Sequence, residues 1–210
     1  MWANLVKYGG IYMEKYSSGL VSESFWFIEC KKIIKLKYDG HSWDEIRAMC
    51  LEENLLGISK EYRAKRIFGY LKNRLSTLDE EVMQIFLEGD LATQKIIILI
   101  AVAKQNRLFY EFLYEIYREK VILGACELNH SDINIFFKNK QDQNEDVASW
   151  TDTTLKRLRS TYMNFMVDAG LLTVNGKNKV PTPPVIDIAL ERYFKDNGET
   201  QLIKAITGVS

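Results

Sequence analysis

One uninterrupted apolar stretch, residues 96–103, constrains the fold more than any other part of the chain. It has the sequence IIILIAVA and lies within residues 91–105. A run of this length is compatible with a buried strand or a buried helix. Asp90 is a favourable N-cap and the residues that follow it favour helix, so helix is the better interpretation. We predict a hub helix over Leu91–Gln105, buried on every side at the centre of an all-α, mostly helical core.

The distribution of charge matters more than its total. The 210 residues are 47% hydrophobic and 27% charged, as is ordinary for a globular protein, and the net charge is zero. Residues 60–74, however, contain six basic residues and one acid, whereas residues 77–90 contain five acids and no base. Because local fields steer charged ligands, a neutral chain can still present a basic face.

The cysteines and the apolar segments indicate the compartment. Cys30, Cys50 and Cys126 are odd in number, far apart and without a CxxC motif, which argues against a disulfide framework or a zinc site. The N-terminus lacks the pattern of a signal peptide, and residues 96–103 are far shorter than the ~20 residues that span a bilayer. We expect a cytoplasmic protein with no membrane partner.

Residues 21–76 are predicted to form an N-terminal helix-turn-helix unit. Three helices are expected, with N-caps at Ser22 or Ser24, at Ser42 within a capping box, and at Ser59. The first ends near Tyr38, the second is followed by a short glycine-containing turn, and the third is long. This order is typical of the helix-turn-helix motif.

The third of these helices, which ends near residue 75, has an apolar face and a basic face. Apolar residues recur at spacings of three and four: Ala64, Ile67, Phe68, Leu71 and Leu75. The opposite side carries the candidate nucleic-acid-binding residues Tyr62, Arg63, Lys65, Arg66 and Asn73. A solvated basic face is the simpler interpretation. Gly69 favours a face that binds nucleic acid, because glycine costs about 1 kcal/mol inside a helix and lets another backbone approach.

Residues 77–124 are predicted to be the central helical core. A capping box from Thr77 to Glu80 begins an acidic helix, and a long helix over about residues 108–123 follows the hub helix to complete a buried helical hairpin. Three tyrosines on the long helix are compatible with a stacking platform for single strands, although an aromatic stripe at helical spacing is more often core: Tyr110, Tyr114 and Tyr117.

Residues 125–182 are predicted to form a winged-helix-like unit. A helix capped by Ser131 precedes a long helix that begins at Trp150 or Thr151 and ends at Gly170. The core stripe of the long helix is Leu155, Leu158, Tyr162, Phe165 and Ala169. Its opposite face carries residue types that bind phosphates and base edges: Thr153, Lys156, Arg157, Ser160 and Asn164.

A β-hairpin is expected directly after this helix. Residues 171–174 and 177–180 have strand character, and Asn175-Gly176 is a strong hairpin-turn signal. The hairpin would form the wing, with Lys177 and Lys179, two residues apart, on one face where they can bind a phosphate backbone. A small hairpin that only closes the core is the alternative.

The two ends of the chain carry less information. Residues 1–20 are poorly patterned, and we expect residues 1–12 to be dispensable. Residues 183–210 are expected to form a helical tail with two short helices, over about residues 185–197 and 200–206.

No catalytic or cofactor motif is present in the sequence. His41 and His130 are isolated from cysteines and from each other, and the chain has no GxxxxGK, GxGxxG or GxSxG motif. We therefore expect no enzyme activity, no cofactor, no metal and no small-molecule substrate.

Several blocks of the sequence resemble a known family. They are residues 42–59, SWDEIRAMCLEENLLGIS; residues 72–81, KNRLSTLDEE; residues 105–120, QNRLFYEFLYEIYREK; and residues 147–172, VASWTDTTLKRLRSTYMNFMVDAGLL. In order and spacing they resemble BrxA, the small A component of BREX bacteriophage-exclusion loci.

The resemblance implies a helical protein with winged-helix-like units and a core similar to that of the antitermination factor NusB. It also implies non-catalytic binding of double-stranded DNA in phage defence, with basic helices over residues 62–73 and 153–164, and other BREX components as possible partners. Two alternatives stay open: an RNA-binding factor of the NusB type, and an adaptor whose basic faces bind acidic proteins of the defence complex.

Overall fold

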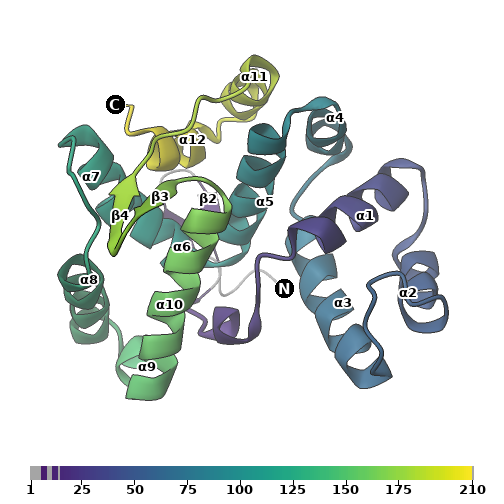
Figure 1. Ribbon diagram of the computed structural model, residues 1–210, viewed down its shortest axis with the longest axis horizontal. Coiled ribbons are helices and arrows are strands. Elements are labelled where there is room, and N and C mark those ends of the chain that lie inside the picture. Colours follow the sequence, from purple (N-terminus) through teal and green to yellow (C-terminus); the bar gives the residue numbers. More distant parts are fainter. Residues whose placement is uncertain (1–5, 9–10, 14, 210) are drawn as a thin grey trace.

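The protein is mostly helical, as predicted (Figure 1). The computed structural model describes residues 6–8, 11–13 and 15–209, with side chains from residue 15 onward. The described strands form two antiparallel hairpins. One is the predicted wing, β3 (Leu172–Asn175) with β4 (Asn178–Pro181). The other, β1 (Val6–Tyr8) with β2 (Ile11–Met13), was not predicted. The expectation that residues 1–12 are dispensable lies largely outside the described residues and stays a prediction.

The hub helix is α5 (Leu91–Gln105), and it is buried as predicted. Every side chain from Ile96 to Ala103 is at most 2% exposed. Asp90 caps the helix by accepting a hydrogen bond from the Thr93 amide at 2.7 Å. Helices on all sides pack against it: α1 (Phe27–Tyr38), α3 (Glu61–Leu75), α4 (Glu80–Glu88), α6 (Arg107–Phe112) and α10 (Asp152–Asp168). An apolar surface around the whole helix therefore has a partner on every side.

The second arm of the central hairpin contains a π-helical turn. The sequence predicted one α-helix over residues 108–123, whereas α6 continues into η2 (Leu113–Tyr117), which is π-helical, and then into α7 (Arg118–Ile122). Tyr110 and Tyr117 are fully buried and Tyr114 is half-buried, with its ring stacked on that of Tyr110. The tyrosine stripe is therefore core, as the more common interpretation of such a stripe predicted.

The first predicted helix begins later than expected, because a distant arginine holds the residues before it. Arg74 of α3 donates hydrogen bonds to Glu23 Oε2 at 2.8 Å, to the Ser24 carbonyl at 3.0 Å and to the Phe25 carbonyl at 2.7 Å. The Ser24 and Phe25 carbonyl oxygens therefore accept hydrogen bonds from Arg74 and not from helix amides, and Trp26 has a left-handed φ of 50°. Helix α1 thus starts at Phe27, and an N-cap at Ser22 or Ser24 was wrong.

Three other predicted N-caps were also displaced by one or two residues. Lys60, not Ser59, precedes α3. Asp79, not Thr77, caps α4, since the Thr77 hydroxyl donates to the Arg74 carbonyl instead. Asn129, not Ser131, caps α8 (His130–Gln143) in a capping box with Asp132. In contrast, the capping box of Ser42 on α2 (Trp43–Glu52) is confirmed. Helix α10, expected to begin at Trp150 or Thr151, begins at Asp152 with Thr151 as its N-cap.

The C-terminal half has the predicted order of helices followed by a hairpin. Helices α8, α9 (Glu145–Ala148) and α10 precede β3 and β4, and Gly170 ends α10 with the expected left-handed φ of 82°. The tail forms α11 (Ile188–Asp196) and α12 (Thr200–Thr207), which pack on α4, α7 and η2. The division into five segments stays a prediction, while buried side chains between Leu20 and Ile206 form one hydrophobic core.

Candidate nucleic-acid interface

The predicted basic face of α3 is exposed. All five residues of the predicted apolar stripe on α3 are buried, which turns the opposite side to solvent. The tyrosine on that side is 67% exposed, and its polar neighbours are also exposed. We call this the first basic face: Tyr62, Arg63, Lys65, Arg66 and Asn73. Gly69 lies beside it with open space where a Cβ would stand.

The predicted polar face of α10 is exposed for the same reason. Its core stripe is buried against α5, α6 and the aromatic side chains around them, with the Phe109 and Tyr162 ring centres 4.9 Å apart. We call the exposed side the second basic face: Thr153, Lys156, Arg157, Ser160 and Asn164. Arg159, expected near the boundary, is half-buried with its guanidinium carbon 5.5 Å from the centre of the Phe137 ring.

The wing forms, but its turn differs from the prediction. Asn175 pairs with Asn178, so the two central turn residues are Gly176 and Lys177. Gly176 has a φ of 61° at the first central position, as a type II′ turn requires. Lys177 is therefore a turn residue, and the argument from strand alternation that placed it on one face with Lys179 was wrong. Lys177 is exposed, whereas Lys179 is half-buried.

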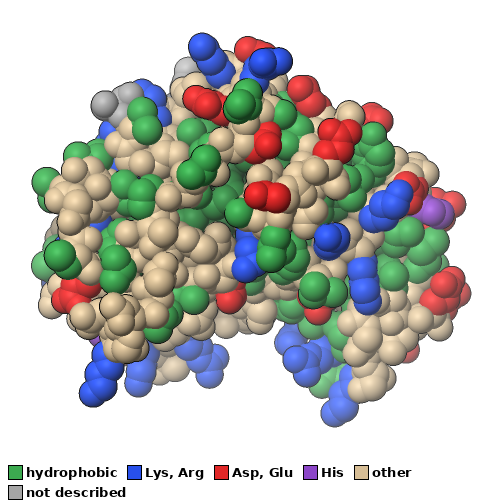
Figure 2. All heavy atoms as spheres, turned by 45° about the horizontal axis from the view of Figure 1, so that its top comes forward, with side chains coloured by type: hydrophobic (Ala, Val, Ile, Leu, Met, Phe, Trp, Pro, Cys, Tyr) green, Lys and Arg blue, Asp and Glu red, His purple; other side chains and the backbone are tan. Residues whose placement is uncertain are grey.

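The two basic faces belong to helices that point to the same edge of the molecule. In Figure 1 the N-terminal ends of α3 and α10 both lie at the lower edge, on either side of a gap. Figure 2 shows Lys and Arg side chains gathered along this edge on both sides of a hollow, while most of the visible Asp and Glu side chains lie higher. The fold therefore turns two separate sequence patterns into one bipartite basic surface.

Seven of the predicted site residues are basic. They are Arg63, Lys65, Arg66, Lys156, Arg157, Lys177 and Lys179. Within the part of the chain that the structure describes, none of them forms an ion pair with a carboxylate. Cations without an ion pair keep their full charge for an external anion.

A cleft of about 500 Å³ brings four of the predicted residues together. It lies between α8, α10 and β4, and Lys156, Ser160, Asn164 and Lys179 all line it. An adjoining hollow of about 190 Å³ extends beneath the wing to Lys177. The residues of the first basic face do not line this cleft, so only the C-terminal unit combines a basic face with this cleft.

Six residues that line this cleft were not predicted, among them His130, Asn134 and Arg159. His130 and Asn134 lie one helical turn apart on α8, and Arg159 lies one turn beyond Lys156 on α10. The spacing of three and four residues was visible in the sequence, but the approach of α8 to α10 was not. Arg74 is the opposite case: it was counted in the basic run of residues 60–74, yet it is fully buried.

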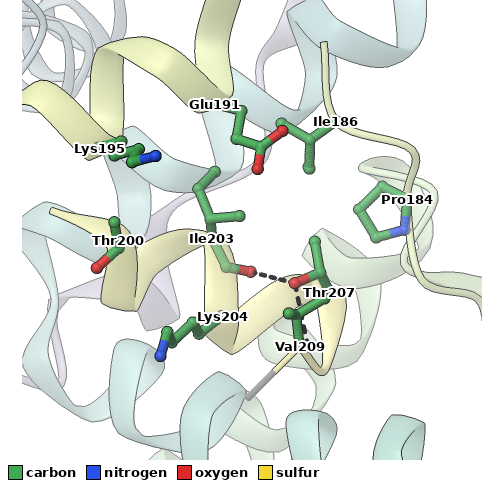
Figure 3. A pocket seen from close by; sticks show the side chains of 9 residues that line it. All are labelled: Pro184, Ile186, Glu191, Lys195, Thr200, Ile203, Lys204, Thr207 and Val209. Atoms are coloured by element: carbon green, nitrogen blue, oxygen red, sulfur yellow. Dashed lines mark hydrogen bonds between the residues drawn. The ribbon is translucent and has the colours of Figure 1, made fainter. Parts of the chain in front are cut away.

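A second hollow, of about 380 Å³, lies between α11 and α12 (Figure 3). These helices are at the edge opposite to the basic faces in Figure 1. Ile186, Ile203 and Val209 give it a largely apolar lining, and Glu191 points toward it. The Thr207 hydroxyl at one side donates to the Ile203 carbonyl at 2.9 Å. None of the predicted site residues lines this hollow, and its charged lining residues are Glu191, Lys195 and Lys204.

The described residues show neither a metal cluster nor a membrane span. No group of three or more His, Cys, Asp or Glu side chains within residues 15–209 could hold a metal ion. Among the same residues, no helix is both long enough and apolar enough to cross a bilayer.

The sequence is similar to those of known proteins. The BrxA family model matches residues 14–198. A BREX protein BrxA of Bacillus cereus (strain H3081.97) is 32% identical over 193 residues, 92% of this chain and 96% of that protein. A BREX protein BrxA of Paramagnetospirillum magneticum (strain ATCC 700264 / AMB-1) is 21% identical over 192 residues, 91% and 96% of the two chains.

A solved structure shares the fold. The crystal structure of an uncharacterized protein from Magnetospirillum magneticum superposes with a TM-score of 0.77 at 20% identity, covering 92% of this chain and 99% of that one. The family match spans most of the sequence, and the Bacillus cereus relative is similar over nearly its full length. The chain therefore belongs to the BrxA family, the A component of BREX phage-defence systems.

Proposed function

We propose that this chain is a non-catalytic accessory protein that binds the backbone of double-stranded DNA during phage defence. The observation that carries the proposal is the bipartite basic surface at one edge of a protein with zero net charge. It consists of two exposed basic helix faces that form no ion pair with any carboxylate of the described residues. Phosphates supply the sequence-independent part of DNA affinity, and Lys and Arg are their usual partners.

The residue types on the second basic face support contact with a duplex. Threonine, serine and asparagine side chains bind phosphate oxygens as well as base edges, and Lys156 and Arg157 add two charges on the same side of α10. Lys177, exposed in the turn of the wing, extends the charge beyond the helix. A helix with an adjacent hairpin can thus contact neighbouring backbone segments of one duplex.

Salt dependence tests the proposal directly. The affinity for a random 30-base-pair duplex is measured by fluorescence anisotropy at several salt concentrations. Each neutralised phosphate contributes about −0.9 to the slope of log affinity against log salt. We expect Lys156→Ala with Arg157→Ala to weaken binding at least tenfold at ~0.1 M salt and to flatten the slope by one to two units, with an unchanged melting temperature.

Two further double variants, each of which also removes two positive charges, serve as comparisons. Arg63→Ala with Arg66→Ala removes the same charge from the first basic face and should also weaken binding. Arg192→Ala with Lys195→Ala removes it from exposed positions of α11, at the opposite edge, and should have no effect. If only the Arg63/Arg66 variant weakens duplex binding, α3 contacts the DNA and the role of the second unit is structural.

The two alternatives have distinct outcomes in the same assay. Equal or tighter binding of an RNA of the same length would favour an RNA-binding factor, because the deep A-form major groove presents a different surface. Duplex binding that none of the variants changes would favour the adaptor. That alternative has its own observation: Val185 and Ile188, near the second hollow, are 94% and 74% exposed, as at protein-binding surfaces.

A further inference from the structure

The cleft between α8, α10 and β4 is larger than a phosphate contact requires. Its volume of about 500 Å³ lies within the roughly 300–1,000 Å³ of pockets that hold small organic ligands. A lysine that binds the outside of a duplex needs no such space. The size therefore indicates a ligand with more than a phosphate group.

The floor of the cleft is apolar. Ile133 and Met163 line it, although only 1% and 4% of their surfaces are exposed. A flat aromatic ring suits such a floor, since the thioether of methionine makes favourable contacts with aromatic groups. The polar side chains around it carry both donors and acceptors that match the edge of a nucleobase: Asn134, Ser160 and Asn164.

The walls of the cleft carry a positive charge. Lys156, Arg159 and Lys179 line it against one carboxylate, that of Asp152. The Nε atom of Arg159 is buried and, among the described residues, has no hydrogen-bond partner. The N-terminus of α8 is not the source of the charge, because Asn129 already caps the Asp132 amide at 3.0 Å. The side chains themselves thus form a basic site above an apolar floor.

We propose that this cleft binds one unstacked nucleotide, with its base against Ile133 and Met163 and its phosphate at Lys156 and Lys179. The inference rests in part on the proposed DNA binding, because Lys156 and Lys179 are also proposed to contact the DNA backbone. A base within an intact duplex stays stacked, so the nucleotide comes from a strand end, a gap or a mismatch, or from a free nucleoside phosphate. The hollow beneath the wing, with Lys177, continues the path for the next phosphate.

The test compares two duplexes that differ only in an unpaired end. One is a blunt 30-base-pair duplex, and the other carries a three-nucleotide single-stranded overhang. An unpaired base can cover the apolar floor of the cleft, which no base of a blunt duplex reaches, so we expect the overhang to tighten binding at least fivefold at equal salt. Equal affinities for the two duplexes, together with no binding of thymidine 5′-monophosphate, would overturn the inference.

A charge-neutral block links this preference to the cleft. Asn134 is an exposed residue of α8, and Asn134→Trp places an indole in the cleft. We expect it to abolish the overhang preference without changing the blunt-duplex affinity or its salt slope. Asn139→Trp, exposed on the same helix but outside the cleft, should preserve the preference. If Asn134→Trp weakens both duplexes equally, the cleft belongs to the duplex surface, and the nucleotide inference fails while the proposed function stands.

Calorimetry with free ligands separates the sources of the nucleotide. Binding of thymidine 5′-monophosphate, lost in Asn134→Trp and absent for inorganic phosphate, supports the site even if no duplex binds, in which case only the proposed function fails. If thymidine 5′-monophosphate binds and the overhang is also preferred, strand ends are one source of the nucleotide. If thymidine 5′-monophosphate binds and the overhang is not preferred, the source is free nucleotides. Equal binding of inorganic phosphate would show a simple anion site and overturn the inference.

Discussion

The guanidinium carbon of Arg74 lies 5.7 Å from the centre of the Phe165 ring, and this contact joins the helices that carry the two basic faces. Arg74 belongs to α3 and Phe165 to α10. The same guanidinium lies 5.5 Å from the centre of the Trp26 ring and is fully buried. A buried cation between aromatic rings is held by cation–π attraction as well as by its hydrogen bonds. Arg74 thus adds a direct contact between the two helices, which both also pack against α5.

Arg74→Met should destabilise the fold strongly. It leaves the Glu23 carboxylate, 5% exposed, without its partner, and breaking a buried pair costs about 3–5 kcal/mol. The free energy of unfolding is measured by urea denaturation. The double variant Glu23→Gln with Arg74→Met should recover part of the loss, because it removes the unpaired charge. A single variant as stable as the wild type would contradict this role of Arg74.

The same pair predicts a pH dependence. Burial raises the pKa of Glu23 above its usual value of 4.5, against the opposing effect of Arg74. The stability that Glu23 contributes is thus present below pH 4.5 and lost as the pH rises through its folded pKa. Removing Arg74 raises that pKa further and moves the loss to higher pH. Arg74→Met should therefore lose more stability than the wild type between pH 5 and 8, and the double variant should not.

Ile98→Asp should unfold the protein. Ile98 is fully buried in α5, and an unpaired charge there costs several kcal/mol, comparable to the stability of a typical domain. Circular dichroism and size-exclusion chromatography check the result. Ile98→Val is the control and should fold, at a cost of about 0.5–1.5 kcal/mol. Soluble, folded Ile98→Asp protein would show that α5 is not the hub of the core.

Gly69→Ala should stabilise the protein and weaken duplex binding. A Cβ at this position meets nothing within 4 Å, so alanine gains about 1 kcal/mol of helix propensity without a clash. If a DNA backbone lies against this part of α3, the added methyl group should lower the affinity several-fold. Denaturation and anisotropy measure the two effects. A more stable variant with unchanged affinity would mean that DNA does not approach α3 at Gly69.

Gly176→Val should displace the wing and weaken duplex binding. The φ of 61° at Gly176 is unfavourable for a residue with a side chain, by roughly 1–2 kcal/mol. Asn175→Val is the control, since Asn175 lies in β3 and keeps a strand conformation. The affinity for the 30-base-pair duplex should fall for Gly176→Val and change little for Asn175→Val. A larger loss of affinity for Asn175→Val than for Gly176→Val would indicate that Asn175 and Gly176 are the central turn residues.

Only one of the three thiols should react quickly in the native state. Burial raises the pKa of Cys30 and of Cys50 to about 11, so both are protonated and unreactive at pH 8, whereas Cys126 is exposed. Titration with a chromogenic disulfide should show one rapid equivalent, and three after unfolding in urea. Two rapid equivalents in the folded protein would contradict the burial of Cys30 or Cys50.

The faces of helices could be predicted from the sequence, and their N-caps only in part. The stripe from Ala64 to Leu75 and the stripe from Leu155 to Ala169 follow from helical spacing alone, and both are buried. N-caps are chosen among polar residues one or two positions apart, and a distant partner can decide between them. Thr77 lost its cap position because its hydroxyl bonds to the Arg74 carbonyl.

The sequence by itself determined a helical protein with a buried hub and two basic helix faces, because periodicity and residue type are local properties. The tertiary structure decided where those faces point, since that depends on how distant helices pack. It placed Arg74 against Glu23, 51 residues away, and thereby took one cation of the basic run of residues 60–74 into the core. It also brought Asn134 of α8 to Lys156 of α10. No local sequence pattern predicts that α8 and α10 lie side by side, because their contact forms only when the chain folds around α5.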